Sequence, residues 1–238
     1  EEVSSGQSRL NYPMIDGKVV GCPHHILEPQ STNLVQYSED FSQSYWQKNN
    51  INETDGFISP DGTANAFKIV ENTSTLRHSL NATNSVLGEV TFSIFAKKGE
   101  IDIIQLSLGG AAINPSGTFS NFDLTNGIIT FGTNTSSTIE EFSNGWYRCS
   151  VTASVVSGIL NVGVVIANSP TMARNGTYQG DGTSGIYIWG AMLEQSSYPT
   201  SYIPTNGSSV TRNAETCNGS GNAATFNDSE GVLMAEIS

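Results

Sequence analysis

The feature that most constrains this chain is the alternation of apolar and polar side chains along short segments, interrupted by tight-turn residue pairs. In 90–98, every second residue is apolar: Val90, Phe92, Ile94 and Ala96. The turn pairs are Asp16-Gly17, Asp55-Gly56, Asp61-Gly62, Asn126-Gly127, Asn144-Gly145, Asn175-Gly176 and Asp181-Gly182. A two-residue period places alternate side chains on opposite faces of a strand, and short strands joined by turns are typical of sandwiches and barrels. The sequence therefore predicts an all-β fold.

The predicted strands are short and few windows have a helical period. They lie near 33–37, 57–59, 65–71, 76–82, 88–98, 102–108, 118–123, 127–131, 138–141, 146–156, 160–167, 185–194 and 210–212. Tyr45-Trp46 is expected on a short turn of helix, with Trp46 packed over one end of the core. No internal repeat is present.

The same period assigns faces to three of these strands. Tyr147, Cys149, Val151 and Ala153 are expected to face the core, with Ile104, Leu106 and Leu108 from a neighbouring strand. The outer face of the sandwich is then expected to carry Phe95, Lys97, Gln105 and Arg148. A β-bulge in any strand would exchange the two faces beyond it.

Composition excludes several partners. The 238 residues hold 22 Asp and Glu against 10 Lys and Arg, which gives a formal net charge of −12. Nucleic acids and anionic membranes bind clustered basic residues, so neither is an expected partner. No stretch reaches the ~18 apolar residues of a membrane-spanning helix. Charged residues make up only 13% of the chain, and the resulting Ser-, Thr-, Asn- and Gly-rich surface suits a secreted or virion protein.

The three cysteines are too scattered for a disulfide framework or a thiolate metal site. Cys149 alternates with Tyr147 and Val151, so a buried, non-functional thiol is expected. Cys22 and Cys217 flank the predicted sandwich, and both a bridge and free thiols are compatible with the sequence.

Six separated pieces of the chain follow one another in a recognisable order. They are Glu28–Leu34, Tyr37–Phe41, Phe122–Leu124, Asn144–Cys149, Tyr187–Glu194 and Thr200–Thr205. Together they resemble a jelly-roll β-sandwich module of bacteriophage tail and fibre proteins and of bacterial carbohydrate-active proteins. The resemblance spans roughly 21–214 and implies a carbohydrate-binding-module-like sandwich of two antiparallel sheets. It divides the chain into a lead-in segment (1–32) that packs on the sandwich, the sandwich domain (33–214), and a linker with the first strand of a following, truncated domain (215–238).

The resemblance also implies a ligand, a polysaccharide or cell-surface glycan. Aromatic rings stack on sugar rings, while Arg and Gln form hydrogen bonds with hydroxyl groups. The candidate ligand-binding residues are Phe95, Lys97, Gln105 and Arg148 of the outer face, with Trp189 and His78 expected nearby. Alternatives stay open for two of them: Trp189 belongs to a motif that the fold itself requires, and Arg148 can instead pair with a neighbouring carboxylate.

A structural calcium ion is a further implication, because modules of this type often hold one between the start of the domain and its last strand. Glu39, Asp40 and Glu194 lie in the corresponding regions and carry the oxygen ligands that Ca²⁺ requires. The stretch Ile188–Gly190 departs from calcium-binding relatives, which carry an Asp there, and this weakens the prediction.

Catalysis is not expected. There is no Gly-x-Ser-x-Gly elbow, His24 and His25 are adjacent and point apart in an extended segment, and no carboxylate pair is marked for glycoside hydrolysis. The sequence therefore predicts a non-catalytic glycan-binding module in a multimeric phage fibre or tail protein, extracellular or virion-associated. The alternatives are a binding module of a secreted bacterial polysaccharide-degrading enzyme and a structural spacer domain in a virion fibre.

Overall fold

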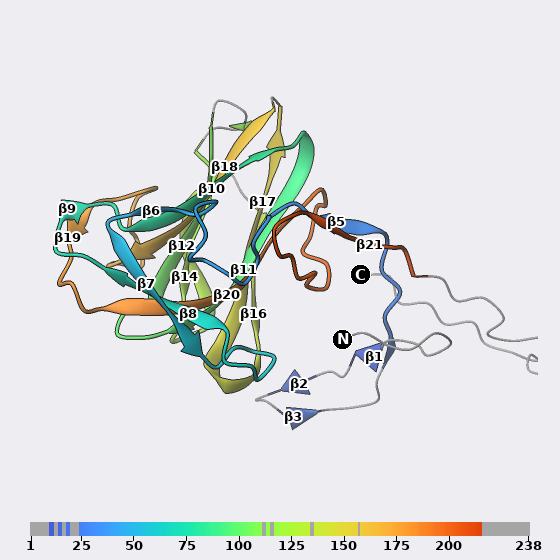
Figure 1. Cartoon of the computed structure of the whole chain (residues 1–238), viewed down its shortest axis with the longest axis horizontal. Coiled ribbons are helices and arrows are strands. Elements are labelled where there is room, and N and C mark those ends of the chain that lie inside the picture. The colour runs from blue at the N-terminus through green and yellow to red at the C-terminus, as the bar shows by residue number, and fades with distance from the viewer. Residues whose placement is uncertain are drawn as a thin grey trace, which may run out of the picture.

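The computed structural model describes residues 26–110, 117–133, 136–156 and 158–215, together with short strands at 10–11, 14–15, 18–19, 24–25 and 113–114. Within these residues the protein is all-β, and the only helical element is a 3₁₀ turn, Ser143–Gly145. No helix in this part of the chain is long and apolar enough to span a membrane. The predicted all-β sandwich of two antiparallel sheets is confirmed (Figure 1).

One layer is a six-stranded antiparallel sheet. Its strands are, in spatial order, β15 (Ile128–Thr133), β14 (Phe119–Asp123), β12 (Ile103–Gly109), β18 (Ile159–Ala167), β10 (Ser79–Ser85) and β6 (Gln47–Asn49). Several neighbours in this order, such as β12 with β18 and β18 with β10, are far apart in sequence, as in a jelly roll, where strands cross between the two sheets.

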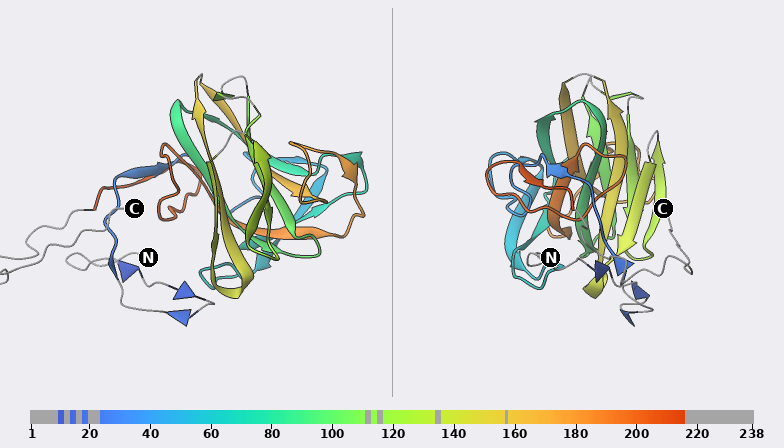
Figure 2. Two further views of the ribbon diagram at one scale, coloured as in Figure 1. Left: turned by 180° about the vertical axis from the view of Figure 1, so that it is seen from behind. Right: turned by 90° about the vertical axis from the view of Figure 1, so that its right-hand side faces the viewer.

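The other layer is a seven-stranded sheet, and the two layers lie face to face in the right-hand view of Figure 2. Six strands follow the order β13 (Ile113–Asn114), β17 (Trp146–Val155), β11 (Gly88–Lys98), β20 (Gly185–Glu194), β8 (Ala66–Glu71) and β7 (Ile51–Phe57). The seventh, β16 (Ser136–Glu141), also pairs with β17.

Four two-stranded pairs complete the described structure. They are β1 (Leu10–Asn11) with β4 (His24–His25), β2 (Met14–Ile15) with β3 (Lys18–Val19), β9 (Thr75–Leu76) with β19 (Tyr178–Gln179), and β5 (Ser31–Asn33) with β21 (Val210–Arg212). Cys22 and Cys217 lie outside the described residues, so the question of a bridge between them stays open. The segment 216–238 also lies outside them, so its predicted strand stays a prediction.

The core forms between the two sheets, as the alternation predicts. Most inward residues of β11, β12, β17 and β18 are buried, and Tyr147 of β17 is half-buried against them. The buried ones are Val90, Phe92, Ile94, Ala96, Ile104, Leu106, Leu108, Cys149, Val151, Ala153, Leu160, Val162, Val164 and Ile166. Cys149 is a free, fully buried thiol whose pKa burial raises, in agreement with the sequence-based prediction. Trp46 is buried beside Phe41 and donates from Nε1 to the Tyr37 carbonyl at 2.8 Å, but on a turn and not on a helix.

A β-bulge in β20 alters the alternation at one point. Phe95 of β11 pairs with Trp189, whereas Ser93 pairs with Met192, so β20 has one more residue than β11 in this interval. Gly190 sits in the extra position at φ +63°, a conformation that residues with a Cβ rarely adopt. The bulge leaves Ile188 and Ala191 in the core and turns Trp189 to the outer face.

Candidate functional site

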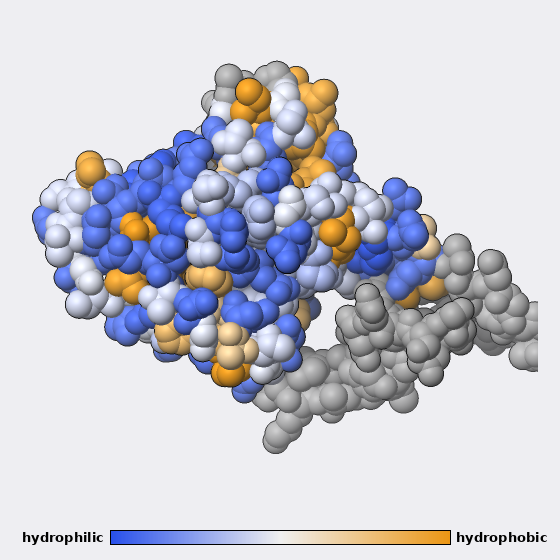
Figure 3. Space-filling view, in the orientation of Figure 1, coloured by the Kyte–Doolittle hydropathy of each residue, from blue (hydrophilic) through white to orange (hydrophobic). Residues whose placement is uncertain are grey.

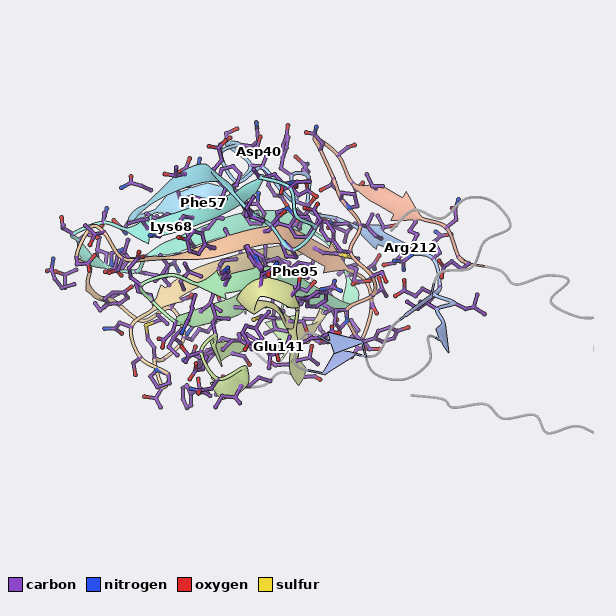
Figure 4. All side chains as sticks on the ribbon, turned by 90° about the horizontal axis from the view of Figure 1, so that it is seen from below. Asp40, Phe57, Lys68, Phe95, Glu141 and Arg212 are labelled. Carbon is purple, nitrogen blue, oxygen red and sulfur yellow. The ribbon has the colours of Figure 1, made fainter. Side chains whose placement is uncertain are left out.

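The outer face of the seven-stranded sheet carries most of the residues that the sequence singled out. Phe95, Arg148 and Trp189 lie side by side here, since Phe95 pairs with Arg148 on β17 and with Trp189 on β20. The Arg148 guanidinium lies 5.5 Å from the centre of the Phe95 ring, and the Phe95 and Trp189 rings are 5.3 Å apart. Figure 4 shows Phe95 over the middle of this sheet.

This face is closed by the chain itself. Residues 195–205, here called the covering segment, run across it from the end of β20. Thr91 Oγ1 donates to the Ser196 carbonyl at 2.8 Å, and the Tyr202 ring packs 4.7 Å from the Trp189 ring. Exposure falls to 4% for Phe95 and 5% for Trp189. The structure therefore brings Phe95, Arg148 and Trp189 together, but the covering segment shields them from solvent. A contact between these residues and a ligand stays a prediction.

Arg148 holds the covering segment in place. Its Nη1 donates to the Thr200 carbonyl at 2.6 Å and its Nη2 to Ser93 Oγ at 3.0 Å. Burial lowers the pKa of this guanidinium, and the charges of Glu194 and Glu140 oppose the shift. The alternative prediction, an ion pair between Arg148 and a neighbouring carboxylate, is not observed. Among the described residues no carboxylate lies within ion-pair distance of Arg148.

The remaining predicted ligand-binding residues lie elsewhere or are only partly accessible. Lys97 is half-buried at the end of the covered face. His78 is fully buried, with Nδ1 2.8 Å from the Asn50 carbonyl and its ring against Tyr178. Gln105 belongs to β12 and lies on the outer face of the opposite sheet. The prediction of one shared outer face is therefore wrong for Gln105, because alternation gives the side of a strand but not the sheet to which the strand belongs.

The three predicted calcium ligands do not assemble into a cation site. Glu194 is fully buried, and its carboxylate accepts hydrogen bonds from Ser31 Oγ (2.6 Å), the Thr200 amide (2.9 Å) and Thr200 Oγ1 (2.7 Å). Asp40 accepts instead from Ser42 and Gln43. No group of three His, Cys, Asp or Glu in the described part of the chain is placed to hold a metal ion. The donor set does not fit Ca²⁺, since the Glu194 oxygens are already occupied by O–H and N–H donors.

Glu39, the third of these carboxylates, lies beside the covering segment. It accepts from Tyr202 Oη at 2.9 Å and from Asn65 Nδ2 at 2.9 Å. Burial raises the pKa of this carboxyl group above 4.5, and the hydrogen bond from Tyr202 opposes the shift.

A polar groove, which the sequence analysis missed, lies on the outer face of the six-stranded sheet. It has a volume of about 270 Å³. Register explains its floor: Ser107 of β12 pairs with Gly163 of β18, Gly163 with Asn81 of β10, and Asn81 with Gln47 of β6. The lining residues are Gln47, Asn49, Arg77, Asn81, Ser107, Gly109, Gly110, Asn161, Gly163, Arg174 and Asn175.

Two glycines keep the groove open. A Cβ at Gly163 would lie 2.6 Å from Ser107 Oγ and 2.9 Å from Asn81 Oδ1. A Cβ at Gly109 would lie 2.6 Å from Arg174 Nη2. Glycine at these positions lets polar side chains lie close over the strands, a known use of glycine within a sheet.

One wall of the groove is the loop that follows β18, and Gln105 fixes it. Gln105 Oε1 accepts from the Asn175 amide at 2.7 Å, and its Nε2 donates to the Ala173 carbonyl at 3.2 Å. Ser107 Oγ donates to Asn175 Oδ1 at 3.2 Å. Gln105 is fully buried, and it positions the loop that forms this wall.

A second hollow, about 350 Å³, contains acidic residues whose oxygens are already engaged. Tyr178 donates to Glu71 Oε2, Lys68 pairs with Glu100 at 2.7 Å, and Asp181 accepts from Ser184 Oγ at 2.6 Å. These hydrogen bonds hold the pKa of Glu100 and of Asp181 below the ordinary range. A general acid needs a raised pKa, so neither of these two groups is suited to that role.

Comparison with known proteins finds only distant structural similarity. No protein-family model and no curated protein matches the sequence. Among solved structures, the enzymatically active domain of bacteriophage CBA120 tailspike protein 4 is similar over 68% of this chain and 21% of that one, at 13% identity and a TM-score of 0.39.

The CBM22-1–GH10 modules of Clostridium thermocellum endo-1,4-β-D-xylanase 10B, complexed with xylohexaose, are similar over 75% of this chain and 30% of that one, at 12% identity and a TM-score of 0.42. The chain thus corresponds to less than a third of either structure. Likeness at this level gives no information on the ligand or on the site.

Proposed function

We propose that this domain is a non-catalytic module that binds glycan in the polar groove. The observation that carries the proposal is the lining: amides, a hydroxyl, two guanidinium groups and glycines from four adjacent strands and the connections beside them. Asn and Gln each present donors and an acceptor, which match the hydroxyl groups of a sugar. Of the described residues that line the groove, none is Asp, Glu or His, so no acid–base pair lies at the proposed site.

The sequence resemblance supports a wider setting, in which the module belongs to a multimeric phage tail or fibre protein outside the cell and adheres to host surface polysaccharide. A shallow groove gives weak single-site binding, and several copies on one particle raise the effective affinity. The mostly hydrophilic surface in Figure 3 suits such exposure. A binding module of a secreted bacterial polysaccharide-degrading enzyme would use the same groove, and its neighbouring domain would distinguish it.

A structural spacer in a virion fibre is the second candidate function. It is favoured by the edge strand β15, where Ile128, Ile129 and Phe131 are 50%, 41% and 40% exposed. An unpaired edge with exposed apolar side chains is a surface that a neighbouring subunit would cover.

The test is a glycan array probed with a multivalent form of the protein and with variants on each face. Gln47→Ala with Asn161→Ala removes two groove amides, and Asn52→Ala on the edge strand β7 removes an exposed amide elsewhere as a control. We expect binding that the double variant lowers and the control does not, with no release of reducing ends from the bound glycan. Absence of binding to every glycan would favour the spacer. Loss on Phe95→Ala or Trp189→Ala in variants that stay folded would move the site to the covered face.

A further inference from the structure

Two arginines lie in the groove, and neither has a negative partner among the residues that the structure describes. Arg77 precedes β10 and Arg174 lies in the loop after β18, and both side chains are half-buried. Arg174 is held by a 2.8 Å hydrogen bond from Nη2 to the Leu108 carbonyl, with its guanidinium over Gly109. Burial lowers the pKa of Arg174, and the positive charge of Arg77, which lines the same groove, lowers it further.

This pairing of like charges is unusual in so acidic a chain. Only 10 residues are Lys or Arg against 22 Asp and Glu. The ion pairs seen in the described residues are Lys48–Glu53, Lys68–Glu100 and Arg212–Glu28, and neither Arg77 nor Arg174 takes part in one there. Two guanidinium groups that line the same partly buried groove repel each other, and an anion bound in the groove would offset that cost.

We propose that the groove selects an acidic glycan, and that Arg77 and Arg174 bind the negatively charged substituent of one sugar, a carboxylate or a sulfate or phosphate ester. The inference rests on the proposed function. The planar fork of a guanidinium matches such oxyanions with two parallel hydrogen bonds. Asn81, Asn161 and Gln47 then face the hydroxyl groups of the same sugar and its neighbours.

The composition of the groove favours charge over stacking as the source of affinity. None of the described lining residues is aromatic, so the ring stacking that many neutral-sugar sites use does not occur there. The same lack of stacking rings, together with the net charge of −12, argues against a nucleic acid as the anion. A polyanionic chain is repelled by most of this surface, so its binding would be confined to the groove.

The experiment compares glycans that differ only in charge. Polygalacturonate is paired with its fully methyl-esterified form, and dextran sulfate with dextran, within an array that also holds phosphorylated and neutral bacterial polysaccharides. We expect binding to at least one acidic glycan. The affinity for its uncharged counterpart should be lower by about tenfold or more, which is the effect of losing one charge-assisted contact. The arms distinguish carboxylate from sulfate and from phosphate.

Arg77→Gln and Arg174→Gln should each weaken the acidic ligand about tenfold or more, whereas Lys98→Gln, an equal charge change on an exposed residue of β11, should not. If neutral glycans bind as well as acidic ones and the two arginine variants bind normally, the inference is overturned while the proposed function stands. If no glycan of either kind binds, the proposed function fails, and this inference fails with it. Weakening by Lys98→Gln equal to that of the arginine variants would show general charge attraction, and would also overturn the inference.

Discussion

The two outer faces of this sandwich differ in whether another part of the chain covers them. On the seven-stranded sheet, an aromatic cluster around Phe95 and Trp189 is sealed by the covering segment. On the six-stranded sheet, a row of amide and hydroxyl groups remains open between strands and loop. The residue types that suggest sugar binding from sequence occur on both faces, but only the open face leaves them accessible. Accessibility, rather than residue type, therefore distinguishes a candidate site from a packed layer.

The largest expected difference between the faces is in stability. Trp189→Ala would remove a buried indole from the aromatic cluster and should lower the free energy of unfolding by about 3–5 kcal/mol. Tyr198→Ala, a change in the covering segment at a residue that is 51% exposed, should have little effect. Chemical denaturation of both variants measures this. Equal stability of the two would mean that the covering segment does not seal this face in solution.

Arg148→Met tests the polar part of the same seal. The substitution keeps most of the apolar volume but leaves the Thr200 carbonyl and Ser93 Oγ without their donors. An unsatisfied buried acceptor costs about 1–3 kcal/mol, so a loss of that size in unfolding free energy is expected. Lys98→Met, which removes an exposed cation from the same sheet, is the matched control. A variant as stable as the control would contradict a fastening role for Arg148.

On the open face, Gly163→Ala should weaken ligand binding as well as folding. The new Cβ would collide with Ser107 Oγ and Asn81 Oδ1 and displace both from the groove floor. Overpacking and the loss of one groove contact are each worth about 1 kcal/mol. Gly158→Ala, where no atom lies within 4 Å of the added carbon, serves as control. Calorimetric titration with the glycan that the array identifies would measure the change, and unchanged affinity would place the ligand elsewhere.

The smallest expected effect is the pH dependence at Glu39. Burial raises the pKa of this carboxyl group, so the folded state holds the proton more tightly than the unfolded state does. Its contribution to stability is therefore present below the ordinary pKa of 4.5 and is lost as pH rises through the folded-state value. Glu39→Gln should raise the unfolding free energy at neutral pH by less than about 1 kcal/mol and leave it unchanged in acid.

The glutamine side chain of the Glu39→Gln variant would have hydrogen-bond partners for both its carbonyl and its amide group. Its carbonyl can still accept from Tyr202 Oη, and Asn65 Oδ1, now buried without a partner, can accept from the new amide after rotation of Asn65. Glu89→Gln, an exposed site on β11, is the control. Thermal melts across the pH range measure the stability of both variants. A gain in stability of Glu39→Gln in acid instead of at neutral pH would contradict the raised pKa of Glu39.

The core strands could be predicted because burial on one face forces alternation. The ranges 88–98, 185–194 and 210–212 agree with β11, β20 and β21 to the residue. Strand β6 and most of β7 were missed, because Gln47–Phe57 is a polar stretch that pairs at a sheet edge and needs no apolar face. The groove was missed with them, since its residues come from four strands whose neighbours in the sheet cannot be read from sequence order.

The motifs behind the family resemblance also have a structural explanation. Asn33 uses its whole amide group: Nδ2 donates to the carbonyls of Ala191 and Ile203, and Oδ1 accepts from the amides of Val35 and Leu193. Glu194 and Thr200 are joined in the same region. Asn33, Glu194 and Thr200, which belong to three of these motifs, therefore close the fold around β5, the end of β20 and the covering segment.

The pairing of β5 with β21 has a mechanical consequence. Ser31 pairs with Arg212, and just outside them Glu215 and Glu28 bond through their backbones at 3.0 Å, so both strands leave the sandwich on the same side (Figure 1). A force that separated residues 28 and 215 would pull along the inter-strand hydrogen bonds and break them one after another. Such a load would act first on this three-residue zipper, and it would reach the seven-stranded sheet through Ser31 and Asn33, which are hydrogen-bonded to the end of β20.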